Sequence, residues 1–168
     1  DCPGLKVTVT GGKDWSSLSS AQFEGYLPKL LALAPSNPRI AYVVGAAEGG
    51  SLKVQRSNDG GTTWKDASPK KAPVGPIAIV VDPLAPDTVV LSTQVGMFRT
   101  IDGGTTWAAL DGRDLELTAP TRTSAENPDG YRLTNVIVAD PLQPGYYWVG
   151  TGAGKAKGIG VFRTRDGG

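Results

Sequence analysis

A nine-residue phrase that occurs twice in register limits the possible folds of this chain more than any other feature. It reads Arg-Ser-Asn-Asp-Gly-Gly-Thr-Thr-Trp over Arg56–Trp64 and Arg-Thr-Ile-Asp-Gly-Gly-Thr-Thr-Trp over Arg99–Trp107. It begins a third time as Arg-Thr-Arg-Asp-Gly-Gly over Arg163–Gly168. Self-similarity at a fixed period marks a repeat architecture, so we expect one structural unit to be used several times.

Each copy contains the same order of apolar runs and turns. An apolar run precedes a Pro-x-x-Pro segment, a second run follows it, and a third run leads from a loop of varying length into the Asp-Gly-Gly turn. The first runs are residues 27–34, 77–81 and 133–139. Short apolar runs bounded by Gly and Pro are typical of strands, so each unit is predicted to be a four-stranded antiparallel meander whose last strand opens with Trp.

A degenerate copy precedes the others. Residues 5–15 keep the Gly-Gly pair and end in Trp15, but Thr10 stands where the Asp is expected. The predicted organisation is one incomplete domain over 1–168, with the end of a unit at 1–18, units at 27–67 and 76–110, and a unit lacking its last strand at 132–168.

The repeated turn has a physical logic of its own. Asp59 and Asp102 can accept hydrogen bonds from backbone N–H groups further along the turn. The glycines that follow supply the positive φ values of a tight hairpin, and the tryptophans carry large apolar area to bury against a neighbouring unit. The residues predicted to form these turns are Ser57, Asp59, Gly61, Trp64, Thr100, Asp102, Gly104, Trp107, Thr164 and Asp166.

Composition excludes several classes of function. The 168 residues include no histidine, which removes Ser/His and Cys/His nucleophile pairs and His-containing zinc sites. A formal net charge of +1, with 17 basic and 16 acidic residues interspersed, gives no electrostatic case for nucleic acid. No apolar run is long enough to span a membrane. The single cysteine, Cys2, cannot form a disulfide within the chain. No metal or cofactor is predicted.

The pattern Ser-x-Asp-x-Gly-x-Thr-Trp, carried by Ser57 to Trp64, resembles the Asp-box, or BNR repeat, of sialidases, and the second copy matches it with Thr100 in place of Ser. The upstream Pro-x-x-Pro resembles that of the Asp-box repeats in xyloglucanases, sortilin-type receptors and photosystem II stability factors. The resemblance implies an all-β fold, a β-propeller whose Asp-boxes lie at the outer hairpins of its four-stranded antiparallel blades.

The length of the chain predicts an incomplete ring. The tryptophans recur roughly 40 to 50 residues apart, the length of one blade, so the chain holds roughly three and a half blades, whereas propellers close with about 4 to 8. An open arc leaves edge strands and apolar blade faces uncovered. The chain also starts at Asp1 without methionine. We therefore expect it to be part of a longer protein, or its ring to be completed by other chains.

Variation in length points to a candidate binding face. In a meander the Pro-rich and Asp-box turns lie on one face, whereas the second hairpins and the links between blades lie on the other. The hairpin is predicted to be a long loop in the first copy, over 45–52, and in the third, over 150–158, but only four residues in the second, over 93–96, and the link before residue 133 is the longest. Loops on a rigid scaffold commonly carry binding groups, although tolerated insertions give the same pattern. The predicted face comprises Glu48, Lys70, Lys71, Arg113, Asp114, Glu116, Arg122, Tyr131, Lys155 and Lys157.

Three motifs that suggest catalysis are better interpreted as structural. Arg56, Arg99 and Arg163 are similar in number to the arginine triad of sialidases, but they occupy one position in every repeat, beside the turn. The repeated aspartates lie one per blade at the periphery, too far apart for the carboxylate pair of a glycosidase. The segment 150–155 has neither the spacing nor the strand-to-helix context of a phosphate loop.

Two functions remain open. A glycoside hydrolase of sialidase or xyloglucanase type needs two carboxylates across the channel, and nothing in the sequence pairs those on the predicted face, which include Glu48, Asp114 and Glu116. A non-catalytic extracytoplasmic propeller, acting as a scaffold or as an interaction module for protein or glycan, needs only the stacked blades and a varied face. We favour the second function, with no catalytic residue assigned.

Overall fold

The computed structural model describes residues 5–8, 10–18, 23–70, 75–94, 96–110, 134–151 and 160–168, and these contain strands and short turns. The strands are β1 (Lys6–Val7), β2 (Ser16–Ser17), β3 (Tyr26–Ala34), β4 (Asn37–Ala47), β5 (Leu52–Ser57), β6 (Lys65–Asp66), β7 (Pro76–Val81), β8 (Val89–Thr93), β9 (Gly96–Thr100), β10 (Ala108–Leu110), β11 (Thr134–Ala139), β12 (Tyr147–Thr151) and β13 (Gly160–Thr164). In these parts of the chain no helix is long and apolar enough to cross a membrane.

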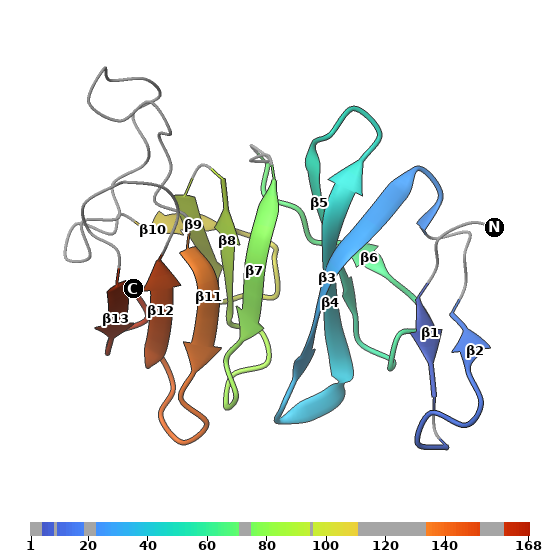
Figure 1. Ribbon diagram of the computed structural model, residues 1–168, viewed down its shortest axis with the longest axis horizontal. Helices are drawn as coiled ribbons and strands as arrows, with labels where there is room; N and C mark the ends of the chain where they lie inside the picture. Colours follow the sequence, from blue (N-terminus) through green and yellow to red (C-terminus); the bar gives the residue numbers. More distant parts are fainter. Residues whose placement is uncertain are drawn as a thin grey trace.

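The strands form four antiparallel sheets that stand side by side in chain order (Figure 1). The hairpin β1–β2 comes first, followed by the first blade, β3–β4–β5–β6, the second blade, β7–β8–β9–β10, and the third blade, β11–β12–β13. Strand β7 lies against both β3 and β11, so the first strands of the blades adjoin along one edge of the arc. The all-β fold is a partial β-propeller, as the sequence predicts.

Two details differ from the sequence prediction. The tryptophans do not open the fourth strands, since β6 begins at Lys65 and β10 at Ala108, one residue later. The second hairpin of the first blade is not a long loop, because β4 continues to Ala47 and β5 starts at Leu52. Gly45 makes this extension possible, because a Cβ there would collide with the carbonyl oxygen of Leu27 on β3. The small residues predicted to form a loop instead prolong the sheet.

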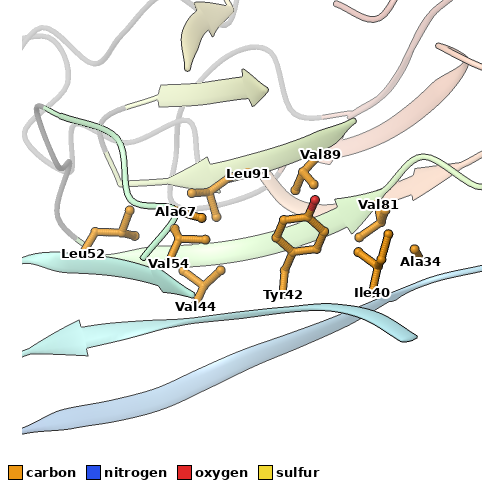
Figure 2. Close-up of a cluster of buried hydrophobic side chains, with 10 residues drawn as sticks. All are labelled: Ala34, Ile40, Tyr42, Val44, Leu52, Val54, Ala67, Val81, Val89 and Leu91. Atoms are coloured by element: carbon orange, nitrogen blue, oxygen red, sulfur yellow. The ribbon is translucent and has the colours of Figure 1, made fainter. Parts of the chain in front are cut away.

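The largest core fills the seam between the first and second blades (Figure 2). Tyr42, Val44 and Val54 project from the first blade, and Val89 and Leu91 project toward them from the second. All five are at most 3% exposed. Because strand side chains alternate between faces, each blade sends one row of apolar residues into the seam before it and another into the seam after it.

The seam between the second and third blades holds a smaller apolar cluster that includes Val90, Ile137, Tyr147 and Val149. A buried carboxylate lies beside it. Asp82, 1% exposed, accepts a hydrogen bond from the Tyr147 hydroxyl at 2.9 Å and one from the Gly145 N–H at 2.9 Å. Burial by itself would raise the pKa of Asp82, but the N–H groups of Gly145, Leu84 and Ala85 and the Tyr147 hydroxyl lower it below its usual range.

Candidate functional site

The turn between β5 and β6 is closed by its own side chains. The Ser57 hydroxyl accepts the Gly61 N–H at 2.8 Å, and the Asp59 carboxylate accepts the Thr63 N–H at 2.9 Å and the Thr63 hydroxyl at 2.6 Å. The Ser57 hydroxyl in turn donates to Asp59 at 2.8 Å. The hydroxyl and backbone donors of Thr63 lower the pKa of Asp59 to about 2. This carboxylate is therefore ionised and occupied within its turn.

The turn after β9 repeats this geometry atom for atom. Gly104 N–H donates to the Thr100 hydroxyl at 2.9 Å, and Thr106 donates its N–H and its hydroxyl to Asp102 at 2.9 and 2.6 Å. The pKa of Asp102 is again lowered to about 2, chiefly by the Thr106 hydroxyl. After β13, the Thr164 hydroxyl donates to Asp166 at 2.6 Å, and it lowers the pKa of that carboxyl.

The N-terminal hairpin forms the same kind of turn, with threonine hydroxyls as the only side-chain acceptors. Thr8 accepts the Gly12 N–H at 3.0 Å, and Thr10, which stands in the Asp position, accepts the Asp14 N–H at 2.9 Å. The Trp15 indole N–H donates to the Gly12 carbonyl at 3.1 Å, as Trp64 does to Gly61 at 2.9 Å. A hydroxyl acceptor thus preserves the backbone geometry while removing the negative charge.

The repeated arginines connect neighbouring blades. Arg56 of the first blade forms an ion pair with Asp87 of the second and lies against Gly103 in the turn of that blade. Arg99 of the second blade donates to the Asp166 carbonyl of the third at 3.4 Å and lies against Gly167. These contacts place both guanidinium groups in the seams between blades.

The second glycine of each turn also lies at a seam. A Cβ on Gly104, whose φ is +96°, would stand 2.6 Å from the Cβ of Ala67 at the end of the first blade. The equivalent glycines approach the equivalent residues of the preceding sheets, Gly61 near Leu18 and Gly168 near Leu110. Each Asp-Gly-Gly turn is therefore packed on the last strand of the sheet before it.

A pocket of about 340 Å³ lies where the link into β3 meets the β4–β5 hairpin. Glu24 and Glu48 both line it, together with Tyr26 and Leu27. The Glu48 N–H donates to the Gly25 carbonyl at 3.0 Å, which fixes the hairpin against the link. Sequence reasoning selected Glu48 and missed Glu24, because residue 24 becomes its neighbour only when β3 pairs with β4.

The predicted binding face is only partly described. Glu48 and Lys70 are both exposed, and they line two different pockets, so the structure does not bring them together. The other predicted residues lie outside the described residues: Lys71, Arg113, Asp114, Glu116, Arg122, Tyr131, Lys155 and Lys157. Among the described residues, no three carboxylate or cysteine side chains gather as a metal site.

Both ends of the arc expose apolar side chains. Leu27, Leu31 and Leu33 on β3 are 58%, 55% and 55% exposed, on the side of the first blade that faces the N-terminal hairpin. At the other end Val138 on β11 is 53% exposed, and Trp148 on β12, covered in part by Arg163 at 5.2 Å, is 44% exposed. Since the inner seams bury the equivalent positions, both ends of the arc expose the kind of surface that the described blades bury against one another.

These features define the class of protein as a partial β-propeller, and solved structures agree. The chain is similar to the GH74 enzyme of Niastella koreensis, with a TM-score of 0.67 and 18% identity over 100% of this chain and 26% of that one. It is similar to the GH74 xyloglucanase of Xanthomonas campestris, with a TM-score of 0.62 and 20% identity over 93% of this chain and 23% of that one.

A third similar structure is YCF48 bound to a D1 peptide, with a TM-score of 0.54 and 19% identity over 88% of this chain and 41% of that one. The chain thus spans less than half the length of each of these structures. No protein-family model and no curated protein sequence matches it. At these sequence identities the similarity defines only the fold, and the function has to be argued from the candidate site.

Proposed function

We propose that this chain is part of a non-catalytic, extracytoplasmic propeller that serves as a scaffold or as an interaction module for a protein or a glycan. The observation that carries the proposal is the engagement of the repeated charged groups. Asp59 and Asp102 are occupied within their turns, and Arg56 and Arg99 within the seams. The groups most suggestive of chemistry are thus used for structure, which leaves the varied loops for recognition. Peptide binding by the similar YCF48 structure supports the same role.

The exposed ends of the arc support the second part of the proposal. Further blades, from the rest of a longer chain or from other subunits, complete the ring by covering Leu31 and Leu33 at one end and Val138 and Trp148 at the other. The lengths of the similar structures support this arrangement, because each is more than twice as long as the segment matched here.

A second candidate function is glycoside hydrolysis, and one observation favours it. Glu24 and Glu48 line a single pocket, and a pair of carboxylates is what glycosidases require, one as acid and one as base or nucleophile. Two of the similar structures are GH74 enzymes. We rank this candidate second because, among the residues that the structure describes, no hydrogen bond orients the carboxylate of Glu24 or that of Glu48.

One experiment separates the two candidates. The longest available form of the protein is assayed for hydrolysis of aryl β-glucosides and xyloglucan oligosaccharides, and the same preparation is tested on peptide and glycan arrays. We expect binding without turnover, and Glu24→Gln and Glu48→Gln at most weaken that binding. Asp66→Asn, an exposed carboxylate on β6, is the matched control. Turnover that Glu48→Gln abolishes and Asp66→Asn spares would overturn the proposed function in favour of the hydrolase.

The proposed extracytoplasmic location has its own test. When the gene that contains this chain is expressed in its host, the protein is expected in the periplasm, at the surface or in the medium. Fractionation against a cytoplasmic marker measures this directly. Recovery with the cytoplasmic marker alone would contradict the location.

A further inference from the structure

Two tryptophans in equivalent positions of the repeat have different surroundings. The Trp64 indole N–H donates to Gly61 in its own turn, and its ring meets the Phe23 ring edge-on, with centroids 5.6 Å apart and planes at 63°. The Trp107 indole N–H instead donates across the seam, to the Ala67 carbonyl of the first blade at 2.9 Å. Phe23 is only 3% exposed, so the chain itself supplies a buried aromatic partner to Trp64.

The link that supplies Phe23 has no aromatic counterpart in the next blade. Phe23 stands eight residues after Trp15, and the residue eight after Trp64 is Ala72, in a link that reads Lys-Ala-Pro-Val over 71–74. Beside Trp107 the structure has an open crevice of about 410 Å³. Its walls are Phe98 and Ala109 from the second blade, Pro69 and Lys70 from the end of the first, and Thr105 and Thr106 from the turn.

The walls of the crevice suit an aromatic ligand. The Thr105 hydroxyl donates to the Asp102 carbonyl at 3.1 Å and the Thr106 hydroxyl to the Asp102 carboxylate at 2.6 Å, so both hydroxyl protons are already engaged and the two oxygens can only accept. Pro69, Phe98, Trp107 and Ala109 make the rest of the wall apolar apart from Lys70, so an aromatic ring gains edge or face contacts with Trp107 and Phe98. The volume lies within the range of sites that bind small ligands.

Lys70 places a positive charge at the rim of the crevice, which favours a ligand that carries a negative charge. Its ammonium group is exposed, and the described residues give it no ion pair. We propose that the crevice beside Trp107 binds an aromatic side chain of a protein partner, in a segment that carries a carboxylate next to the aromatic residue to face Lys70. This inference rests on the proposed interaction role and gives it one site and one ligand chemistry.

The test uses a defined peptide, acetyl-Gly-Glu-Phe-Glu-Gly-amide, with Leu and Ala versions at the central position. Binding to the longest folded form of the protein is followed by the NMR signals of the tryptophan indole N–H groups, among which Trp107→Phe identifies the signal of Trp107. We expect the Phe peptide to shift the Trp107 signal and to bind about tenfold more tightly than the Ala peptide, with Leu between them. Equal binding of all three peptides would overturn the inference.

Two matched variants locate the site. Ala109→Trp fills the crevice and is expected to abolish binding, while Ala108→Trp adds the same ring to the opposite face of β10 and is expected to leave it unchanged. Lys70→Glu should weaken binding of the acidic peptide, and exchanging its Glu residues for Lys should restore binding. Melting temperatures confirm that each variant is folded.

Three results contradict the inference: equal loss in both Trp variants, no effect of Lys70→Glu, or shifts of the Trp107 signal by cellotetraose that exceed those by the Phe peptide. The last result would assign the crevice to a glycan. Each of these leaves the proposed interaction role standing, because array binding elsewhere on the protein is measured separately.

Discussion

The two seams between blades are built from the same repeat by different means. The first seam has the larger apolar core, with Tyr42, Val54 and Leu91 fully buried, and the Tyr42 hydroxyl donates to the neutral Pro86 carbonyl at 3.0 Å. The second seam has fewer buried apolar residues, and the Tyr147 hydroxyl donates to the buried carboxylate of Asp82. Burial raises the pKa of both tyrosines, that of Tyr42 to about 12. The repeated turn thus determines where neighbouring blades meet. The strand residues between the turns determine which interactions hold the blades together.

The largest expected effect is the removal of a core side chain from the first seam. Leu91→Ala should lower the free energy of unfolding by about 2 to 5 kcal/mol, because it leaves a cavity among fully buried neighbours. Ile137→Ala in the second seam, where that residue is 8% exposed, should fall at the lower end of the range. Urea denaturation at pH 7 measures both, and equal losses would show that the two seams are equally well packed.

Removing one hydroxyl tests the polar part of the second seam. Tyr147→Phe should cost about 1.5 to 3 kcal/mol, because it deprives a buried carboxylate of a donor. Tyr42→Phe in the first seam should cost about 0.5 to 1.5 kcal/mol, since its partner is a neutral carbonyl. The same urea titration compares them, and the reverse order would contradict the contrast between a charged and a neutral acceptor for the tyrosine hydroxyl.

A single added methyl group tests how closely the turns pack. Gly104→Ala places a Cβ against Ala67, and overpacking of this kind costs about 1 to 3 kcal/mol. Gly60→Ala is the matched control, because its φ is also positive, at +75°, but no atom lies within 4 Å of its Cβ. The thermal melting temperature of Gly104→Ala should therefore be the lower of the two. Indistinguishable melting temperatures would mean that the turn shifts freely away from the preceding blade.

The smallest effect concerns the charge in the turns. The pKa of Asp102 is lowered from 3.8 to about 2, so its contribution is fully present above pH 3.8 and is lost as pH falls through about 2. Asp102→Asn does not titrate, so the melting temperatures of the two proteins should converge between pH 5 and pH 2. Thr106→Val, which removes the hydroxyl donor, should move this loss to higher pH. A constant difference would contradict the assigned pKa.

The strand order was predictable because Gly and Pro punctuate the chain at nearly every turn. The runs 77–81 and 133–139 became β7 and β11 to within one residue at each end. The extension of β4 through Gly45 was not predictable, since small residues are typical of loops and become strand here only because β3 covers them. Asp82 directly precedes a Pro-x-x-Pro segment, and its hydrogen-bond partner Tyr147 is 65 positions away, a pairing that only the stacking of blades creates.

The candidate site was less predictable than the fold. Glu48 was recognised by its place in a hairpin of varying length. Its neighbour in the pocket, Glu24, lies instead in the link into β3. The crevice beside Trp107 carried no signal in the sequence, because both copies of the motif share the segment Asp-Gly-Gly-Thr-Thr-Trp and the difference arises from Phe23, outside the motif. Most of the predicted face lies outside the described residues and stays a prediction.

The position of the arginines has a consequence for moving blades between proteins. Arg56 belongs to one sheet by its strand and to the next by its contacts, and so does Arg99. A graft cut at the sheet boundaries would separate each guanidinium from the turn that it holds. The segment that keeps these contacts together runs from one arginine through the Asp-Gly-Gly turn of the next blade, so the transferable module is displaced along the chain relative to the visible sheet.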